Sequence, residues 1–582
     1  MNNPNHSRTL ATQFPTRMFH TRMEPLINTG ALARWKDARA VWELFQEFVE
    51  SSRKPLKRLI GATSSLHRAK AAVLMRTCGK AWRIWGLGAS MLLAIAGSAL
   101  AGVHYVDENS TNATPPFTNW TTAATNIQDA VDAAVVGDEI LVTNGTYHPL
   151  TVGKPLSVRS INGPQFTTID AGGSGRCAYL TNSASLSGFT LTNGFAYDQG
   201  GGVWCQSTNA VVSNCVIIGN RASASAYSEF ASVNADGGGA YGGTLNDCTL
   251  TGNSVGGDYD YFGSFGRGDY GGQGSGAAYS TLNNCALTGN SAIVEGFYIN
   301  TAHAQGGGAA YCTLNNCTLT GNSSAVEGLD IYNADAQGGG AFGCTLNNCT
   351  LTGNSVGTYI FVPISIIEDG GGASGSTLNN CILFGNSPDG DGGSPGSLAG
   401  NNWIGDPLFV NLAAGNLRLR SNSPCINAGN NSYATNATDR DGNPRIAGGT
   451  VDIGAYEFQS PVSVISYAWL QQYGLLPANG STDTADPHGD GVDNYREWIA
   501  GTNPTNRFSS PAQLTITPSG VPPSGIILTW STNAVGFTLQ STTNLSSPAV
   551  WSTNSPAPVV IAGQNTVTNP ITGAQKFYRL VQ

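Results

Sequence analysis

The sequence predicts a mainly β protein whose central part is a solenoid of stacked parallel strands. A block of about 32 residues recurs in the middle of the chain: residues 281–312, 313–344 and 345–376 each begin Thr-Leu-Asn-Asn-Cys and each contain a Gly-Gly-Gly-Ala run. A repeat of this length indicates one small unit stacked on itself. The blocks are rich in Thr, Asn, Ser and Gly, and their apolar residues alternate rather than recur at helical spacing, which favours strands over helices.

Two residue types mark the register of the repeat. Successive turns of such a solenoid place equivalent residues about 4.8 Å apart, so repeated positions become rows. One row is expected to be a buried thiol ladder: Cys215, Cys248, Cys285, Cys317, Cys349 and Cys381. The other is expected to be an amide ladder that satisfies its own donors and acceptors: Asn220, Asn253, Asn290, Asn322, Asn354 and Asn386.

These features resemble the right-handed parallel β-helix of pectate-lyase-like proteins over about residues 104–400. The Gly-Gly-Gly-Ala runs and the Leu-Phe-Gly-Asn-Ser sequence at 383–387 also resemble the repeats of chlamydial polymorphic outer membrane proteins. The resemblance implies a right-handed β-helix over residues 102–400. It implies no single activity, because this fold hosts enzymes and non-catalytic adhesins alike.

The segment before the solenoid contains a pattern that predicts a targeting signal. Residues 75–101 combine a basic start, an apolar run and the small residues Ser98-Ala99-Leu100-Ala101, which is typical of a signal peptide. We therefore expect translation to begin at Met75 and residues 1–74 to be a gene-model artefact; a cytosolic extension before a membrane anchor is the alternative. The expected location is secreted, extracellular or on the outer cell surface, with no transmembrane segment after cleavage.

The charge limits the classes of binding partner, and the cysteine content indicates how the thiols are used. Residues 1–101 hold 15 of the 28 Lys and Arg and 5 of the 37 Asp and Glu, so the remainder has 13 basic and 32 acidic residues, a net charge of about −19. This surface disfavours nucleic acid and suits divalent cations. Eleven cysteines follow the signal peptide, and we expect buried thiols with at most an occasional disulfide, for example between Cys312 and Cys344.

Four further units are expected before and after the repeats of the solenoid. An amphipathic helix at 127–134 is expected to cover its first rung. Four motifs in residues 401–460, from Asp406-Pro-Leu-Phe to Asp452-Ile-Gly-Ala-Tyr-Glu, resemble the choice-of-anchor Q module, which implies a C-terminal cap. Its Asp, Arg and Glu residues are interpreted as a charged cap, with an active site as the alternative. Residues 461–508 are expected to form an EF-hand-like unit and 509–582 a β-sandwich resembling immunoglobulin-like or fibronectin-like modules.

The sharpest chemical motif is the twelve-residue segment 486–497. It matches the register of an EF-hand calcium loop, including Gly491 at the tight sixth position, although His488 replaces an oxygen ligand at the third. It resembles the calcium loops of dockerin-like and thrombospondin-type-3-like modules, which implies a structural Ca²⁺; an Asp-rich turn between two helices is the alternative. The predicted ligands are Asp486, His488, Asp490, Val492 (through its carbonyl), Asn494 and Glu497.

The insertions between the Gly-Asn-Ser and Gly-Gly-Gly sequences are interpreted as loops that emerge on one side and form a continuous face. Aromatic rings and acids on such a face suit sugar rings and their hydroxyls, although loops that merely pack on each other are the alternative. The candidate ligand-binding residues are Tyr227, Asp258, Tyr259, Tyr261, Glu295, Phe297, Tyr298, Glu327, Tyr332 and Tyr359.

Two functions remain open from the sequence. The favoured one is a non-catalytic, monomeric β-helix rod that acts as an adhesin-like or polysaccharide-contacting protein. The alternative is a polysaccharide lyase or glycoside hydrolase of the pectate-lyase-like fold. The regularity of the repeats argues against catalysis, because catalytic residues usually break a local pattern, and no catalytic residue is assigned.

Overall fold

The computed structural model describes residues 101–581 except 225–232, 258–268, 298, 362–364, 389–390, 393–400, 508, 510–513, 521–523, 532–536, 547–548, 555, 562–563 and 573–574. The expectations for residues 1–74 and for the signal peptide, apart from Ala101, lie outside this part of the chain. Within it, no helix is long and apolar enough to cross a membrane.

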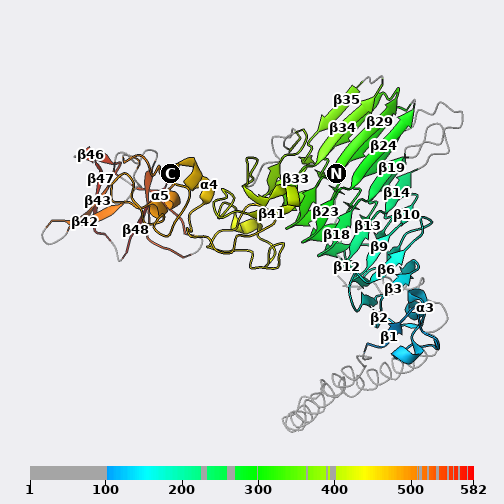
Figure 1. The fold of residues 1–582 in the computed structure, drawn as a ribbon. Helices are drawn as coiled ribbons and strands as arrows, with labels where there is room; N and C mark the ends of the chain where they lie inside the picture. Colours follow the sequence, from blue (N-terminus) through cyan, green and yellow to red (C-terminus); the bar gives the residue numbers. More distant parts are fainter. Residues whose placement is uncertain are drawn as a thin grey trace, which may run out of the picture. The chain divides into compact units, whose positions relative to one another are not determined.

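The centre of the molecule is a right-handed parallel β-helix with three walls, whose strands stack from blue to green in Figure 1. The first wall contains β1 (Val103–Val106), β2 (Glu139–Val142), β5 (Ser157–Ser160), β8 (Ser185–Ser187), β12 (Val211–Ser213), β17 (Thr244–Asn246), β22 (Thr281–Asn283), β27 (Thr313–Asn315), β32 (Thr345–Asn347) and β37 (Thr377–Asn379). The second contains β3 (Gly145–Tyr147), β6 (Thr167–Asp170), β9 (Thr190–Thr192), β13 (Val216–Ile218), β18 (Thr249–Thr251), β23 (Ala286–Thr288), β28 (Thr318–Thr320), β33 (Thr350–Thr352) and β38 (Ile382–Phe384). The third contains β4 (Leu150–Val152), β7 (Ala178–Leu180), β11 (Val203–Cys205), β16 (Ala240–Tyr241), β21 (Ala277–Ala278), β26 (Ala309–Ala310), β31 (Ala341–Phe342), β36 (Ala373–Ser374) and β39 (Asp391–Gly392).

The 32-residue period of the sequence sets the register in which the strands of each wall pair. Thr281, Thr313 and Thr345 are paired in adjacent strands, as the 32-residue spacing requires. Leucines and cysteines point inward and form one continuous buried core along the solenoid. All eleven cysteines in the described part of the chain are buried and unpaired, which confirms the predicted buried thiols.

The predicted amide ladder is present and runs through the interior. Each Asn side chain donates from Nδ2 to Oδ1 of the Asn one rung further on, at 2.9–3.0 Å from Asn220 to Asn386. Each of these residues is at most 4 % exposed. A buried amide is costly unless all its polar atoms are bonded, and stacking meets that requirement at every rung.

The insertions between Gly-Asn-Ser and Gly-Gly-Gly are strands in the described residues, so the expectation of loops was wrong. One sheet contains β10 (Phe195–Ala196), β14 (Arg221–Ala224), β19 (Ser254–Gly257), β24 (Ser291–Phe297), β29 (Ser323–Leu329) and β34 (Ser355–Ile360). Its partner contains β15 (Val233–Asp236), β20 (Asp269–Gln273), β25 (Thr301–Gln305), β30 (Asn333–Gln337) and β35 (Ser365–Asp369). The two sheets, which we call the fin, share a core of small side chains, mostly Ala and Val.

The glycine run closes each turn of the fin onto the third wall. A Cβ on Gly307 would overlap the backbone oxygens of Ser323 and Gly339, which belong to neighbouring segments. Only glycine permits this approach, so the Gly-Gly-Gly run marks the corner at which the chain leaves the fin.

Both ends of the solenoid are covered. Helix α3 (Ile127–Ala133), predicted as the first cap, buries Ile127, Ala130 and Val131; the 3₁₀ turn η2 (Trp120–Thr122) precedes it. At the other end, residues 401–459 contain β40 (Phe409–Asn411), η3 (Leu412–Ala414), β41 (Asn416–Leu419) and η4 (Asn431–Tyr433). This segment bonds to the last rungs: Nδ2 of Asn348 donates to the Tyr433 carbonyl at 2.7 Å.

Two small units complete the chain. Helices α4 (Tyr467–Gln472) and α5 (Asn494–Ala500) flank the predicted cation loop. Two antiparallel sheets follow, with Leu528, Trp530, Leu539 and Val567 in their core. Their strands are β42 (Thr515–Ser519), β43 (Gly525–Ser531), β44 (Thr538–Thr542), β45 (Ser552–Thr553), β46 (Val559–Ile561), β47 (Gln564–Pro570) and β48 (Phe577–Val581).

Candidate functional site: the cation loop and the fin

The loop at 486–497 is organised by one carboxylate. Oδ1 of Asp486 accepts the backbone N–H of Gly489 at 2.8 Å, and Oδ2 accepts that of Gly491 at 2.8 Å. These bonds lower the pKa of Asp486 below its ordinary value. Gly489 and Gly491 have φ of 70° and 91°, a conformation that favours glycine. The sequence therefore folds this segment into a tight turn with an ionised carboxylate at its centre.

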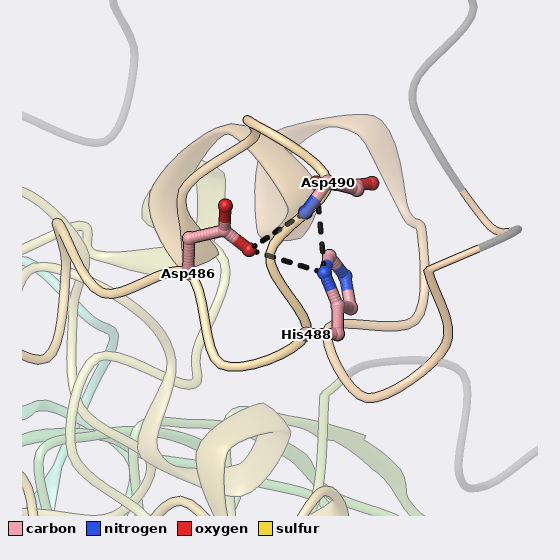
Figure 2. A group of neighbouring side chains, drawn as sticks. All are labelled: Asp486, His488 and Asp490. Carbon is pink, nitrogen blue, oxygen red and sulfur yellow. Dashed lines mark hydrogen bonds and ion pairs between the residues drawn. The ribbon is translucent and has the colours of Figure 1, made fainter.

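The loop brings together three of the predicted ligands. Ligating atoms of Asp486, His488 and Asp490 all lie within 4.8 Å of one another, and Figure 2 shows the imidazole beside both acids. Val492 lies in the same turn, where its N–H donates to Oδ1 of Asp490 at 2.8 Å. The loop then runs directly into α5, whose first turn is capped by Asp493.

The remaining two predicted ligands lie buried at the start of α5. Glu497 is fully buried, and burial raises the pKa of its carboxyl above the ordinary value. Its Oε2 and the Oδ1 of Asn494 are buried atoms without a hydrogen-bond partner in the described structure. Buried acceptors are rarely left unbonded in native proteins. These residues therefore fit a bound cation, which would supply the missing contacts.

The structure brings together only some of the ten residues that were predicted to form the ligand-binding face. Five of its residues, namely Tyr227, Asp258, Tyr259, Tyr261 and Tyr298, lie outside the described residues. Glu295, Glu327 and Tyr359 are paired across β24, β29 and β34, so they form one row. Phe297 is the last residue of β24.

Tyr332 lies apart from that row, between β29 and β30. The structure thus joins three of the ten predicted residues into one row. At the Tyr359 end of the row, the last strands of the fin expose large apolar side chains. Tyr359 is 69 % and Phe361 84 % exposed, and Ile366 and Ile367 are also exposed.

The acids and arginine of the cap have structural partners. Both oxygens of Asp452 accept backbone N–H groups, from Asn427 and Phe458, each at 2.7 Å. Glu457 accepts the N–H groups of Ala447 and Asp452. Arg445 is buried with them. Carboxylates engaged in this way hold the chain in place, which supports the interpretation as a charged cap.

A shallow open hollow of about 460 Å³ lies where the second wall meets the fin, lined by Asp170, Asn193, Phe195 and Arg221 among others. The pKa of Asp170 is lowered by hydrogen bonds from the side chain of Asn193 and the N–H of Gly172. A glycosidase needs two carboxyl groups, one with a raised pKa. The hollow is lined by one carboxyl, and its pKa is shifted in the opposite direction.

An aromatic row that was not predicted from the sequence runs along the outside of the third wall. The rings of Tyr179, Trp204, Tyr241, Tyr279, Tyr311 and Phe342 contact one another on successive rungs, with centroids 4.8–6.3 Å apart. The signal was the aromatic residue one or two positions after the Ala that follows most glycine runs. Tyr279 and Tyr311 stack at 18°, so their facing surfaces are covered by each other and are closed to a ligand.

No protein-family model and no curated protein matches the chain. Among solved structures, it is similar to the pectate lyase Pel9A with a TM-score of 0.32 and 15% identity over 61% of this chain and 96% of that chain. It is also similar to the pectin methylesterase of Aspergillus niger (TM-score 0.21, 15% identity, 53% of this chain and 85% of that chain). The pectin methylesterase PemA from Erwinia chrysanthemi gives a TM-score of 0.19 and 11% identity over 39% of this chain and 78% of that chain.

These likenesses concern the fold alone. The resemblances of residues 401–460 to the choice-of-anchor Q module and of residues 486–497 to dockerin-like loops stay predictions.

Proposed function

We propose that this protein is a non-catalytic β-helix rod, secreted or displayed on the outer cell surface, that contacts polysaccharide through its fin. The observation that carries the proposal is the exposed end of the fin, where Tyr359 and Phe361 present open aromatic side chains. The acids Glu295 and Glu327 continue the row from Tyr359. Aromatic rings cover the apolar faces of sugars, and carboxylates accept hydrogen bonds from their hydroxyls.

The charge of the rod indicates the class of polysaccharide. Residues 102–582 carry a net charge of about −19 and contain two lysines, Lys154 and Lys576. A surface of this sign repels polyanions. We therefore propose a neutral glycan as the ligand. The proposed acting form is a monomer.

The alternative function is a polysaccharide lyase or hydrolase, and the hollow beside Asp170 and Arg221 is the place that favours it. An arginine next to an ionised acid suits a lyase better than a hydrolase. The lining of this hollow contains a single carboxyl group, which argues against a hydrolase at this place.

We also propose a structural cation in the loop at 486–497, where the register predicts Ca²⁺. Asp486 lies at the start of the loop and Glu497 within α5. An ion that engages both would tie the turn to the helix, and thus stiffen the connection between the cap and the C-terminal sheets.

The chain starting at Gly102 is expected to be retained by insoluble neutral polysaccharides and to release no sugar ends. Tyr359→Ser is expected to weaken retention about tenfold or more, which is the loss of roughly 1.4 kcal/mol of binding free energy. Sedimentation of bound protein with a panel of neutral and acidic polysaccharides measures the retention, and a reducing-end and unsaturated-product assay runs in parallel.

Tyr197→Ser is the matched control, because Tyr197 is 71 % exposed and follows β10, at the opposite end of the same fin sheet. Equal loss in both variants would contradict binding at the end of the fin. Released sugar ends would make the protein an enzyme.

A further inference from the structure

The third ligand position of the cation loop holds an imidazole, and its surroundings differ from those of an oxygen ligand. The side chain of His488 is 92 % buried by the loop and α5, since 8 % of it is exposed. Its two ring nitrogens face different groups. Nε2 contacts Oε1 of Glu497 at 3.4 Å, whereas Nδ1 faces the two aspartates.

The contact with Glu497 defines which nitrogen is available for an ion. An ion at Nδ1 requires the imidazole proton on Nε2, and the carboxylate of Glu497 is placed to accept a hydrogen bond from that N–H. Nδ1 makes no hydrogen bond, although Oδ1 of Asp486 lies 3.1 Å away. Carboxylate–histidine pairs of this kind support metal-ligating histidines in proteins. Glu497 is therefore placed to hold the imidazole.

The spacing of the ligand atoms admits a tetrahedral ion, and the imidazole is what distinguishes zinc from calcium. Nδ1 of His488 lies 3.1 Å from Oδ1 of Asp486 and 3.5 Å from Oδ1 of Asp490. Zinc forms bonds of about 2.0–2.2 Å to nitrogen and oxygen, so two of its tetrahedral ligands lie roughly 3.3–3.6 Å apart. Calcium prefers six to eight oxygen ligands at longer distances, and imidazole suits zinc and its neighbours.

We propose that the loop at 486–497 binds Zn²⁺ in preference to Ca²⁺, through Nδ1 of His488 and the carboxylates of Asp486 and Asp490. The proposal rests on the cation site proposed above and changes the class of its ion. Glu497 acts as a positioning residue that orients the imidazole. The unbonded Oδ1 of Asn494 lies at the start of the same helix and remains available to the ion or to a water bound to it.

Buried thiols do not compete for zinc in the folded protein. The eleven described cysteines lie inside the solenoid and the cap, each at most 3 % exposed. A zinc signal from unfolded chain would show thiolate ligation, which cobalt reports as an intense charge-transfer absorption. A site made of one imidazole and two carboxylates lacks that band, so Co²⁺ absorption distinguishes the two sources.

The test is isothermal titration calorimetry of the metal-free chain from Gly102 with ZnCl₂ and with CaCl₂, followed by Co²⁺ absorption. We expect one Zn²⁺ site at least about tenfold tighter than any Ca²⁺ site, and a Co²⁺ spectrum without thiolate bands. His488→Asp restores an oxygen ligand, so we expect it to weaken Zn²⁺ binding and strengthen Ca²⁺ binding, which reverses the preference. His303→Gln is the matched control: His303 lies 3.1 Å from Asp335 on the fin, and its loss is expected to leave both titrations unchanged.

Glu497→Gln tests the positioning role, because an amide at this place no longer fixes the tautomer by charge. We expect weaker Zn²⁺ binding with the Co²⁺ spectrum retained at saturation. Circular dichroism checks that each variant is folded.

Tighter Ca²⁺ binding by the native chain would overturn this inference and leave the calcium proposal standing. No binding of either ion would overturn both. Zinc binding that survives His488→Asp but is lost in His303→Gln would place the ion on the fin and contradict the assignment to the loop.

Discussion

Arg445→Met is expected to destabilise the cap at residues 401–459 by about 3–5 kcal/mol, the usual cost of removing one partner from a buried ion pair. Arg445 is 2 % exposed. Its Nη2 donates to the carbonyls of Asp452 at 3.0 Å and Gly454 at 2.6 Å, and Nη1 lies 3.5 Å from Oε2 of Glu457. Methionine fills similar space but removes the counter-charge of Asp452 and Glu457, which matters in the pH range in which these two buried carboxyl groups are ionised.

The loss of stability caused by Arg445→Met is expected to depend on pH. Burial and the neighbouring Asp452 raise the pKa of Glu457 to about 8, against the opposing effect of Arg445. A carboxyl whose pKa is higher in the folded than in the unfolded state favours folding at low pH, and this contribution is lost as the pH rises through the folded pKa. Removing Arg445 raises that pKa further. The variant should therefore lose most stability near pH 9 and least near pH 5.

Urea denaturation at the two pH values measures the effect, and hydrogen exchange at residues 425–457 locates it. Arg418→Met is the matched control, because Arg418 forms a two-bond pair with Asp441 in the same cap but its side chain is 51 % exposed. Exposed pairs contribute up to about 1 kcal/mol. Equal losses in the two variants would contradict the structural role assigned to the buried cluster.

The solenoid could be predicted from the sequence because its order is one-dimensional. A 32-residue period places Cys317 over Cys285 and Asn322 over Asn290 whatever the shape of the turns between them. The thiol and amide rows therefore needed only the spacing of the repeat. The fin was missed for the opposite reason. Segments such as 333–337 do alternate, but their apolar residue is Ala, which has a low preference for strands, and they become strands through pairing with the rung beside them.

The candidate sites were predicted to differing degrees. The EF-hand register brought Asp486, His488 and Asp490 together, because residues two positions apart in a tight turn lie close to one another wherever the rest of the chain goes. The contact between His488 and Glu497 spans nine residues and depends on where α5 begins, which the spacing does not specify. On the third wall, Tyr279 and Tyr311 have φ of 52° and 53°, values that disfavour bulky residues, so local preference argued against the row they form.

Asn322→Leu is expected to destabilise the solenoid by roughly 3–6 kcal/mol, because it leaves several buried polar groups unbonded at a cost of about 1–3 kcal/mol each. Nδ2 of Asn322 donates to the carbonyl of Leu287 at 3.0 Å and to Oδ1 of Asn354 at 2.9 Å. Its Oδ1 accepts the backbone N–H and the Nδ2 of Asn290, at 3.0 and 2.9 Å. Leucine has a similar volume, so it admits no water that could replace these bonds.

A second amide row provides the control. Nδ2 of Asn283 donates to Oδ1 of Asn246 at 2.9 Å, and its own Oδ1 accepts from Asn315 at 2.9 Å. This row lies on the outer side of the first wall and is half-buried in its central rungs, so water can bond the groups that a substitution leaves free. Asn283→Leu is expected to cost less than about 1 kcal/mol by the same measurement.

Thermal and urea unfolding of Asn322→Leu and Asn283→Leu compares the free energy of unfolding lost from the buried amide row with that lost from the half-buried row. Both substitutions replace an amide that lies between the amides of two adjacent rungs, but Asn322 also bonds two backbone groups and lies out of reach of water. A solenoid is stabilised by contacts between adjacent rungs, so a defect at Asn322 should also increase hydrogen exchange on the rungs at 290 and 354 while leaving those near α3 protected. Equal stability of Asn322→Leu and Asn283→Leu would show that the leucine and cysteine core alone stabilises the stacked rungs. The interior amide row would then fix the register of the strands without adding to the free energy of unfolding.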